Sequence, residues 1–166
     1  MPATSTNIQE RWREITEEPH LSELPYKVET NARGQLILSP HSPYHSHLQG
    51  RILDKLREAA PEGQGMPEFP IATDGGVKVP DVVWMPSGRF EELIESGNPP
   101  TRAPDVCIEV LSDSNDEIEM SEKRRLYRQA GAEEVWQVGK DGAVEFYNEQ
   151  GRAAKSNCVP NFPEEV

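Results

Sequence analysis

The chain has 166 residues, a length that fits one domain with an ordinary core. Hydrophobic residues make up 35% and charged residues 28%, and no apolar run approaches the roughly 20 residues that a membrane helix needs. The net charge of -12 argues against a broad nucleic-acid surface, because phosphate contacts need clustered Lys and Arg.

Residues 1–10 lack both a basic segment and an apolar stretch, so we expect no secretory signal, a cytoplasmic location and no membrane partner. The two cysteines are too few for a disulfide framework and too far apart for a paired zinc motif. Cys107 lies within an apolar run, which predicts a buried, inert thiol.

The first part of the chain predicts a polar helix, a hairpin and an amphipathic helix. Residues 8–18 are typical of a short helix that the segment from Pro19 to Pro25 breaks. Strands over 26–29 and 35–38 flank a turn at 31–34. Apolar residues then recur at helical spacing over 44–59, and Pro43 is placed to begin that helix.

The middle of the chain predicts strands over 68–72 and 78–85, joined by a turn at 74–76. A surface excursion over 86–104, with a short helix at 90–94, is expected to act as a lid. Residues 105–111 are apolar and β-branched enough for a central strand. Capping candidates at 112–116 precede a helix that runs to about 130.

A final hairpin is predicted over 135–138 and 143–147, around the turn at 140–142. The tail after Gly151 is polar and expected to be loosely held. The predicted organisation is a helix and connector (1–23), one α/β domain (24–150) and a polar C-terminal tail (151–166).

Two acids interrupt the apolar strands of this α/β domain. Asp81 stands before Val82 and Val83, and Glu109 stands inside the strand that ends at Leu111. A carboxylate buried without a partner is costly, so each must pair with a cation, accept hydrogen bonds or bind a metal. An exposed position at a strand end is the alternative for either acid taken alone. Two close carboxylates suit magnesium or manganese, since these ions prefer oxygen ligands.

The pattern resembles a known family at several points: Pro80-Asp81, Ile108 to Ser112, Glu122-Lys123-Arg124, and Glu134-Val135-Trp136, with Leu24 to Glu29 and Ser39-Pro40 earlier in the chain. Together these are similar to the bacterial family of putative restriction endonucleases, a branch of the PD-(D/E)XK nuclease superfamily. The resemblance covers residues 24–148. It implies a restriction endonuclease-like mixed sheet flanked by helices, in a single domain.

The resemblance also implies roles for individual residues. Asp81 and Glu109 would bind Mg²⁺ or Mn²⁺, and Lys123 would orient a water or offset charge in the transition state. The superfamily's common lysine, two residues after the second acid, is replaced here by Leu111. Lys123 matches the lysine that this family carries on the following helix. Glu29 lies where this family often has an acid and is a candidate to support the site, with an exposed strand residue as the alternative. His47 matches the family's helix histidine and is a candidate for phosphate contact or support.

The resemblance therefore implies a metal-dependent endonuclease that hydrolyses DNA and acts alone or as a homodimer. The alternative is a catalytically inactive nuclease-fold module for binding or interaction, which the charge and Leu111 favour. A zinc hydrolase built on His41, His45 and His47 is a third idea, although three histidines without a fourth ligand are weak evidence for zinc. The basic stretch 123–128 either contacts a nucleic-acid backbone or is a solvated, salt-bridged surface.

Overall fold

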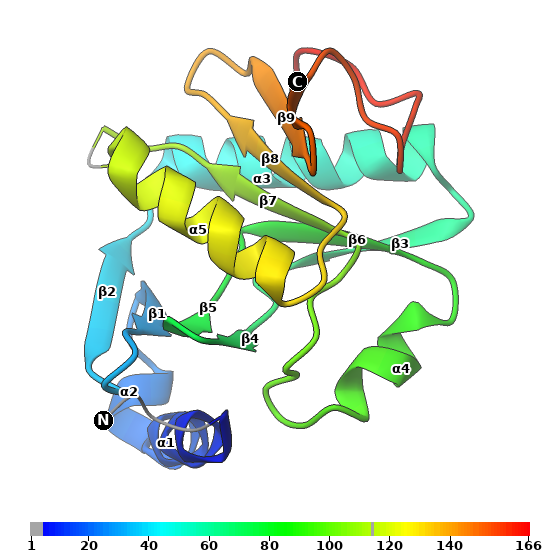
Figure 1. Ribbon diagram of the computed structural model, residues 1–166. Helices are drawn as coiled ribbons and strands as arrows, with labels where there is room; N and C mark the ends of the chain where they lie inside the picture. The colour runs from blue at the N-terminus through cyan, green and yellow to red at the C-terminus, as the bar shows by residue number, and fades with distance from the viewer. Residues whose placement is uncertain (1–4, 114) are drawn as a thin grey trace.

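A computed structural model describes residues 5–113 and 115–166 of the chain (Figure 1). Its helices are α1 (Ser5–Glu17), α2 (Pro19–Ser22), α3 (Pro43–Ala59), α4 (Arg89–Ile94) and α5 (Glu117–Gln129). Its strands are β1 (Tyr26–Thr30), β2 (Leu36–Pro40), β3 (Gly63–Pro67), β4 (Ile71–Thr73), β5 (Gly76–Lys78), β6 (Val82–Pro86), β7 (Val106–Val110), β8 (Glu134–Val138), β9 (Val144–Asn148) and β10 (Gly151–Ala153). Within the described ranges, no helix is long and apolar enough to cross a bilayer.

The centre of the fold is a six-stranded mixed sheet in the order β10-β9-β8-β7-β6-β3. β7 and β8 are parallel and are joined through α5, whereas the other neighbouring strands are antiparallel. This confirms the predicted mixed α/β sheet. The predicted central strand is β7, which lies between β6 and β8.

One face of the sheet packs against α3, which lies behind the strands in Figure 1. The helix contributes Leu48, Ile52 and Leu56, which are three or four residues apart and therefore share one face. They pack against alternate residues of the strands, among them Ile108 on β7 and Trp136 on β8.

The opposite face carries α5, drawn in front of the sheet in Figure 1. Cys107 of β7 points to this face, where it packs in a cluster with Tyr127 of α5 and Val135 of β8. Because side chains alternate along a strand, Glu109 points the same way as Cys107. Strand periodicity thus places a carboxylate beneath the helix that carries Lys123.

The β1–β2 hairpin stands beside this face as a separate two-stranded sheet. It is held by α1 and by the small β4–β5 hairpin through a third apolar cluster, to which α1 contributes Ile8, Trp12 and Ile15. Side chains alternate along β1, so Lys27 and Glu29 share one side of the strand and both are buried. The N-terminal helix therefore supports the hairpin that brings two charged residues to the sheet.

Several predicted elements are confirmed, and others differ from the prediction. The first hairpin, the helix begun by Pro43 and the helix after Asp116 lie where expected. Residues 63–67 form a strand that was not predicted, and the predicted strand over 78–85 is divided between β5 and β6. Pro19 begins the short helix α2 within the segment expected only to break a helix. Ser114, within the predicted capping segment, lies outside the described residues.

The C-terminal segment is docked on the domain, contrary to the expectation of a loosely held tail. β10 extends the central sheet, and Val159 and Phe162 are buried against the α3-facing core. The Glu134 carboxylate accepts hydrogen bonds from the backbone N–H groups of Asn157 and Cys158 and from the Ser156 hydroxyl, at 2.6 to 3.0 Å. A buried carboxylate on β8 thus fixes the tail to the sheet.

Candidate functional site

Asp81 stands immediately before β6 and is buried to 1% exposure. Its Oδ2 accepts a hydrogen bond from the backbone N–H of Val110 at 2.8 Å, which ties it to the end of the neighbouring strand β7. Its Oδ1 lies 3.1 Å from Lys27 Nζ and 3.2 Å from His45 Nε2. Both oxygens of this carboxylate are therefore engaged.

Glu109 lies on β7, and its carboxylate is surrounded by three donors. The Tyr127 hydroxyl donates to Oε1 at 2.6 Å, and Lys123 Nζ lies 3.3 Å from the same oxygen. Oε2 lies 3.4 Å from Lys27 Nζ. The structure thus brings Asp81 and Glu109 to one place, where the Lys27 ammonium contacts both.

Lys123, on α5, reaches the site from the helix that crosses the sheet. Its ammonium lies between Glu109 Oε1 and Glu29 Oε1, at 3.3 and 3.2 Å. Glu29 is in turn fixed by the backbone N–H of Val79, which donates to Oε2 at 2.7 Å. Both residues were predicted to belong to the site. Lys123 contacts Glu109 directly, and Glu29 is linked to Glu109 through Lys123.

The histidines are arranged differently from the prediction. His47 is exposed, with its ring near that of Tyr44, and it lies outside the cleft. His45 instead contacts Asp81, and His41 lies beside it, with the two Nδ1 atoms 3.4 Å apart. In the sequence His45 was named only as part of a weak zinc cluster, although it falls on the same helical stripe as the buried Leu48 and Ile52.

The environment shifts the pKa values of Asp81 and Glu109 in opposite directions. Burial disfavours the charged form of both, and for Glu109 it raises the pKa above its ordinary value. For Asp81 the charge on Lys27 and the hydrogen bonds from His45 and Val110 outweigh burial, so its pKa lies well below the usual range. Asp81 is therefore the more firmly ionised of the pair.

The two lysines remain protonated. Burial disfavours the ammonium of Lys123, but Glu109 and Glu29 outweigh it and raise its pKa. The same holds for Lys27, whose pKa is raised by Glu109, Asp81 and Glu29 against the effect of burial. The site is accordingly a buried network in which two ammonium groups face the carboxyl groups of Asp81, Glu109 and Glu29.

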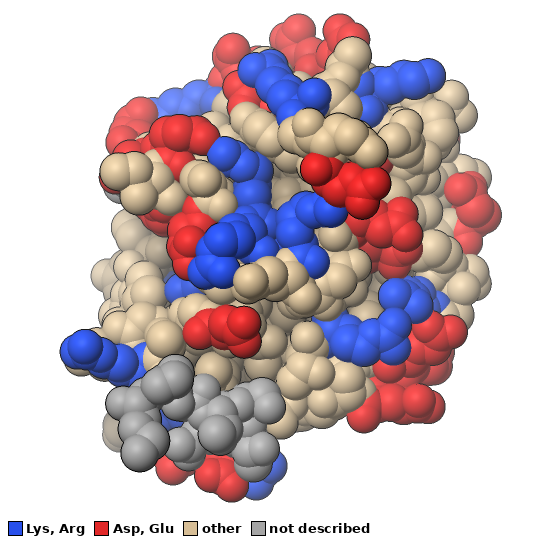
Figure 2. Space-filling model, viewed as in Figure 1, with Lys and Arg blue, Asp and Glu red and all other residues tan. Residues whose placement is uncertain are grey.

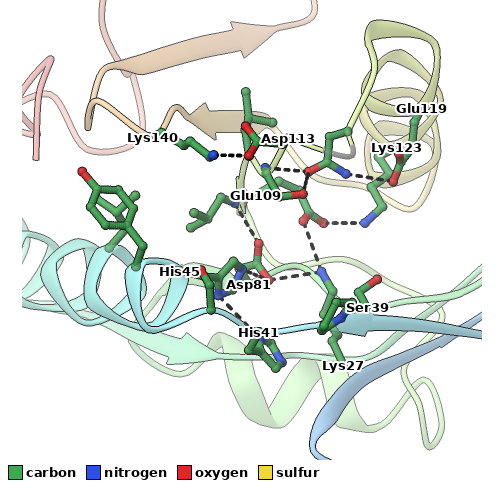
Figure 3. Close-up of a pocket in the computed structure, with 18 of the residues that line it drawn as sticks. Lys27, Ser39, His41, His45, Asp81, Glu109, Asp113, Glu119, Lys123 and Lys140 are labelled. Carbon is green, nitrogen blue, oxygen red and sulfur yellow. Dashed lines mark hydrogen bonds and ion pairs between the residues drawn. The ribbon is translucent and has the colours of Figure 1, made fainter.

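The network forms the floor of a cleft of about 840 Å³ (Figure 3). The cleft is bounded by β2, the start of α3, the end of β7, the start of α5 and the β8–β9 turn. Its acidic lining residues are Asp81, Glu109, Asp113 and Glu119, and its lysines are Lys27, Lys123 and Lys140. The excursion over 86–104 contributes no lining residue, so the structure does not place the expected lid at this cleft.

The donors fit a hard divalent cation in their chemistry. Asp81 Oδ1 and Glu109 Oε2 both face one cation, the Lys27 ammonium, and carboxylate oxygens are ligands that Mg²⁺ and Mn²⁺ prefer. Over the described ranges, no group of three or more His, Cys, Asp or Glu side chains could hold a metal ion. The candidate ligand set is thus the two acids, and the histidine cluster offers no zinc site.

The basic stretch on α5 is largely engaged with neighbouring side chains. Figure 2 shows Lys and Arg side chains gathered over and beside α5, with acidic side chains around them. The Arg124 guanidinium stacks 4.2 Å from the centre of the Tyr147 ring and pairs with Glu117. Arg125 pairs with Glu122. This arrangement matches the salt-bridged surface that was one of the two interpretations.

Sequence reasoning missed Lys27, His45 and Tyr127. The sequence held a signal for Lys27, which is two residues before Glu29 on a strand, and for Tyr127, which is four residues after Lys123 on a helix. Both spacings place the missed residue beside a predicted one. The contact of Lys27 with Asp81 and Glu109, which lie 54 and 82 residues away in sequence, needs the tertiary structure.

Comparison with known proteins shows which family and which solved structure the chain is similar to. Residues 15–164 match the family Uma2, described as "Putative restriction endonuclease". A crystal structure of a putative nuclease from Anabaena variabilis ATCC 29413 is similar in fold, with a TM-score of 0.61 and 17% identity, over 80% of this chain and 79% of that one. No curated protein matches the sequence.

Proposed function

This chain belongs to the Uma2 family of putative restriction endonucleases, and from that premise we propose that it is a metal-dependent nuclease that hydrolyses phosphodiester bonds of DNA. The observation that carries the proposal is the meeting of Asp81, Glu109 and Lys123 at the floor of one cleft. Acids and a lysine in this combination suit phosphodiester hydrolysis, in which negative charge must be held and a water directed.

Each residue has a proposed role. Asp81 and Glu109 would hold Mg²⁺ or Mn²⁺, which when bound supplies Lewis acidity and lowers the pKa of a water. Lys123, held between Glu109 and Glu29, would orient the attacking water or offset the charge that develops on the phosphate.

Further residues hold the acids in place. Tyr127 fixes one oxygen of Glu109, and the Val110 N–H and His45 fix Asp81. These neighbours keep the two carboxylates directed at a common point. A second copy of the chain would supply the second site needed to cut both strands of a duplex, so we propose a homodimer on duplex DNA.

Cleavage assays with single substitutions test the function. Purified protein with Mg²⁺ or Mn²⁺ is expected to cut plasmid and oligonucleotide DNA, and Asp81→Asn, Glu109→Gln and Lys123→Met are expected to lower the rate by at least about 100-fold. The matched controls change exposed residues of the same types: Asp54→Asn, Glu122→Gln and Lys155→Met. Activity that persists equally in the site variants would exclude this site as the catalytic centre.

The second candidate function is a non-catalytic binding module with a nuclease fold. The observation that favours it is charge: the cleft is lined by four acids and three lysines, in a chain of net charge -12. It predicts no cleavage of DNA or RNA under any metal condition. It also predicts that Asp81→Asn changes the stability of the fold without changing any partner interaction.

A further inference from the structure

Lys27 occupies the position at which the two acids converge. Its ammonium lies 3.1 Å from Asp81 Oδ1 and 3.4 Å from Glu109 Oε2, and it also donates to the Val79 carbonyl at 3.1 Å. The side chain is 7% exposed. The two oxygens that would hold a metal ion therefore already share a cation supplied by the chain itself.

Charge counting favours a metal ion in place of this cation over a metal ion beside it. With Asp81, Glu109 and Glu29 all counted as carboxylates, they face the ammonium groups of Lys27 and Lys123, and the set carries one negative charge. A divalent ion added to this set would leave one positive charge in a buried site. A divalent ion that replaces the Lys27 ammonium leaves none, and a balanced buried site is the less costly one.

The position of Lys27 permits such an exchange. Lys27 lines the cleft, so its flexible side chain can swing from the acidic pair into the cleft (Figure 3). Lys123 is held differently, because its ammonium lies between Glu109 and Glu29 and does not contact Asp81. Its two partners remain in place when Lys27 leaves.

We propose that Lys27 is an internal cation that occupies the metal position of the acidic pair, and that a divalent ion binds only by displacing its ammonium into the cleft. The inference rests on the proposed metal site and adds a positioning residue to it. Lys27 keeps Asp81 and Glu109 together and charge-compensated before metal arrives, and it weakens the affinity for the metal. It then lies free in the cleft, where an ammonium can contact a phosphate.

Calorimetric titration with Mn²⁺ tests the proposal. Lys27→Met removes the charge and keeps a long side chain, so it is expected to tighten Mn²⁺ binding by about tenfold or more, because a competing unit charge is removed at contact distance. Lys78→Met is the matched control: Lys78 is near the same hairpin but donates to the Thr30 carbonyl, so its loss is expected to leave Mn²⁺ affinity near the wild-type value. Adding Asp81→Asn to Lys27→Met is expected to abolish binding.

The outcomes separate this inference from the proposed function. Unchanged or weaker Mn²⁺ binding in Lys27→Met overturns the inference, and if the wild type still cuts DNA with metal, the proposed function stands. Binding by Lys27→Met alone, with no binding and no cleavage by the wild type, supports the inference and overturns the proposed function.

A measurement on the unaltered protein covers the case in which Lys27→Met does not fold. An amine-reactive label, read by mass spectrometry, is expected to modify Lys27 faster when Mn²⁺ is present, because the amine has left its buried partners. Lys123, which is similarly buried, is the internal control and is expected to show no such increase. Labelling of Lys27 that Mn²⁺ does not change overturns the proposal.

Discussion

At the scale of single residues, Asp81 is the most constrained group of the site. It is held by the Lys27 ammonium, by His45 and by the Val110 N–H, and these contacts keep its pKa well below the usual range despite burial. A carboxylate whose pKa is depressed in the folded protein contributes its full stabilising free energy above its pKa in the unfolded chain, and the contribution is lost progressively as the pH falls toward the folded pKa. Its contribution therefore depends on pH.

The pH dependence of stability checks this assignment. The Asp81 contribution is fully present above about pH 4, the ordinary pKa of an aspartate, and is lost as the pH falls toward the depressed folded value. Between about pH 5 and about pH 3, wild-type unfolding free energy is expected to fall by at least about 1 kcal/mol more than that of Asp81→Asn. Urea denaturation at each pH measures both, and parallel curves would contradict the shift.

The sequence identified the acids of the site more readily than their partners. Asp81 and Glu109 interrupt apolar strands, and Lys123 and Glu29 followed from the family resemblance. Lys27 was given no role from the sequence, because its burial arises only when the hairpin packs beside β7. The helix register that favours His45 over His47 is visible from Leu48 and Ile52, yet the contact with Asp81 is not.

At the scale of elements, the β1–β2 hairpin is positioned by a close backbone contact with the β4–β5 turn. Gly76 has a φ of +104°, and a Cβ at this position would lie 2.3 Å from the Thr30 carbonyl oxygen at the end of β1. Backbone atoms cannot yield as a flexible side chain can. The turn and the hairpin that carries Lys27 and Glu29 are therefore coupled.

Gly76→Ala is expected to destabilise the protein by more than about 3 kcal/mol, since the strain of a positive φ adds to a backbone clash. Gly88→Ala is the matched control: Gly88 also has a positive φ, +85°, but a Cβ there meets no atom within 4 Å. Its cost is expected to be about 1 kcal/mol. Thermal unfolding compares the two, and equal losses would show that the hairpin contact contributes nothing.

The docked C-terminal segment depends on the Glu134 carboxylate. Beyond the groups of the tail, it accepts from Trp136 Nε1 at 2.8 Å. Glu134→Gln replaces one acceptor oxygen by a donor and is expected to cost about 1–3 kcal/mol. Chemical denaturation measures this, with the exposed Glu91→Gln as control. A variant as stable as the wild type would mean that the tail is held by its apolar side chains alone.

Elements with clear periodicity were predictable, and elements fixed by their neighbours were not. The apolar spacing of α3 and the β-branched residues of β7 are local signals. β3, with the sequence Gly-Gln-Gly-Met-Pro, has poor strand propensity and becomes a strand by pairing with β6. The tail likewise has a polar sequence, but three of its residues donate hydrogen bonds to Glu134 and two of its apolar side chains pack in the core.

At the scale of the whole molecule, the proposed function requires a chain with a net charge of -12 to hold nucleic acid, and this charge allows it few contacts. Arg124 and Arg125 of α5 pair with acidic side chains, and Arg128 donates to the Glu133 carbonyl. The lysines of the cleft are Lys27, Lys123 and Lys140. Phosphate recognition is then local to the cleft. Long-range attraction of DNA is not expected from the remainder of the surface.

Weak salt dependence follows from this distribution. Because each phosphate neutralised contributes about -0.9 to the slope of log K against log salt, three lysines set a slope no steeper than about -3. Fluorescence anisotropy with a labelled DNA duplex, in Ca²⁺ to prevent cleavage, measures it. A slope much steeper than this would show that the α5 arginines contact the backbone, and removal of Arg125 and Arg128 would then reduce it.

The most direct measurement of the acidic site is a crystal structure of the protein soaked in Mn²⁺, with the ion located by its anomalous scattering. We predict one ion in contact with both Asp81 and Glu109, with Lys123 still beside Glu109 and the Lys27 ammonium moved into the cleft. Well-diffracting crystals with no ion at the two carboxylates, or with Lys27 still between them at saturating Mn²⁺, would contradict this prediction.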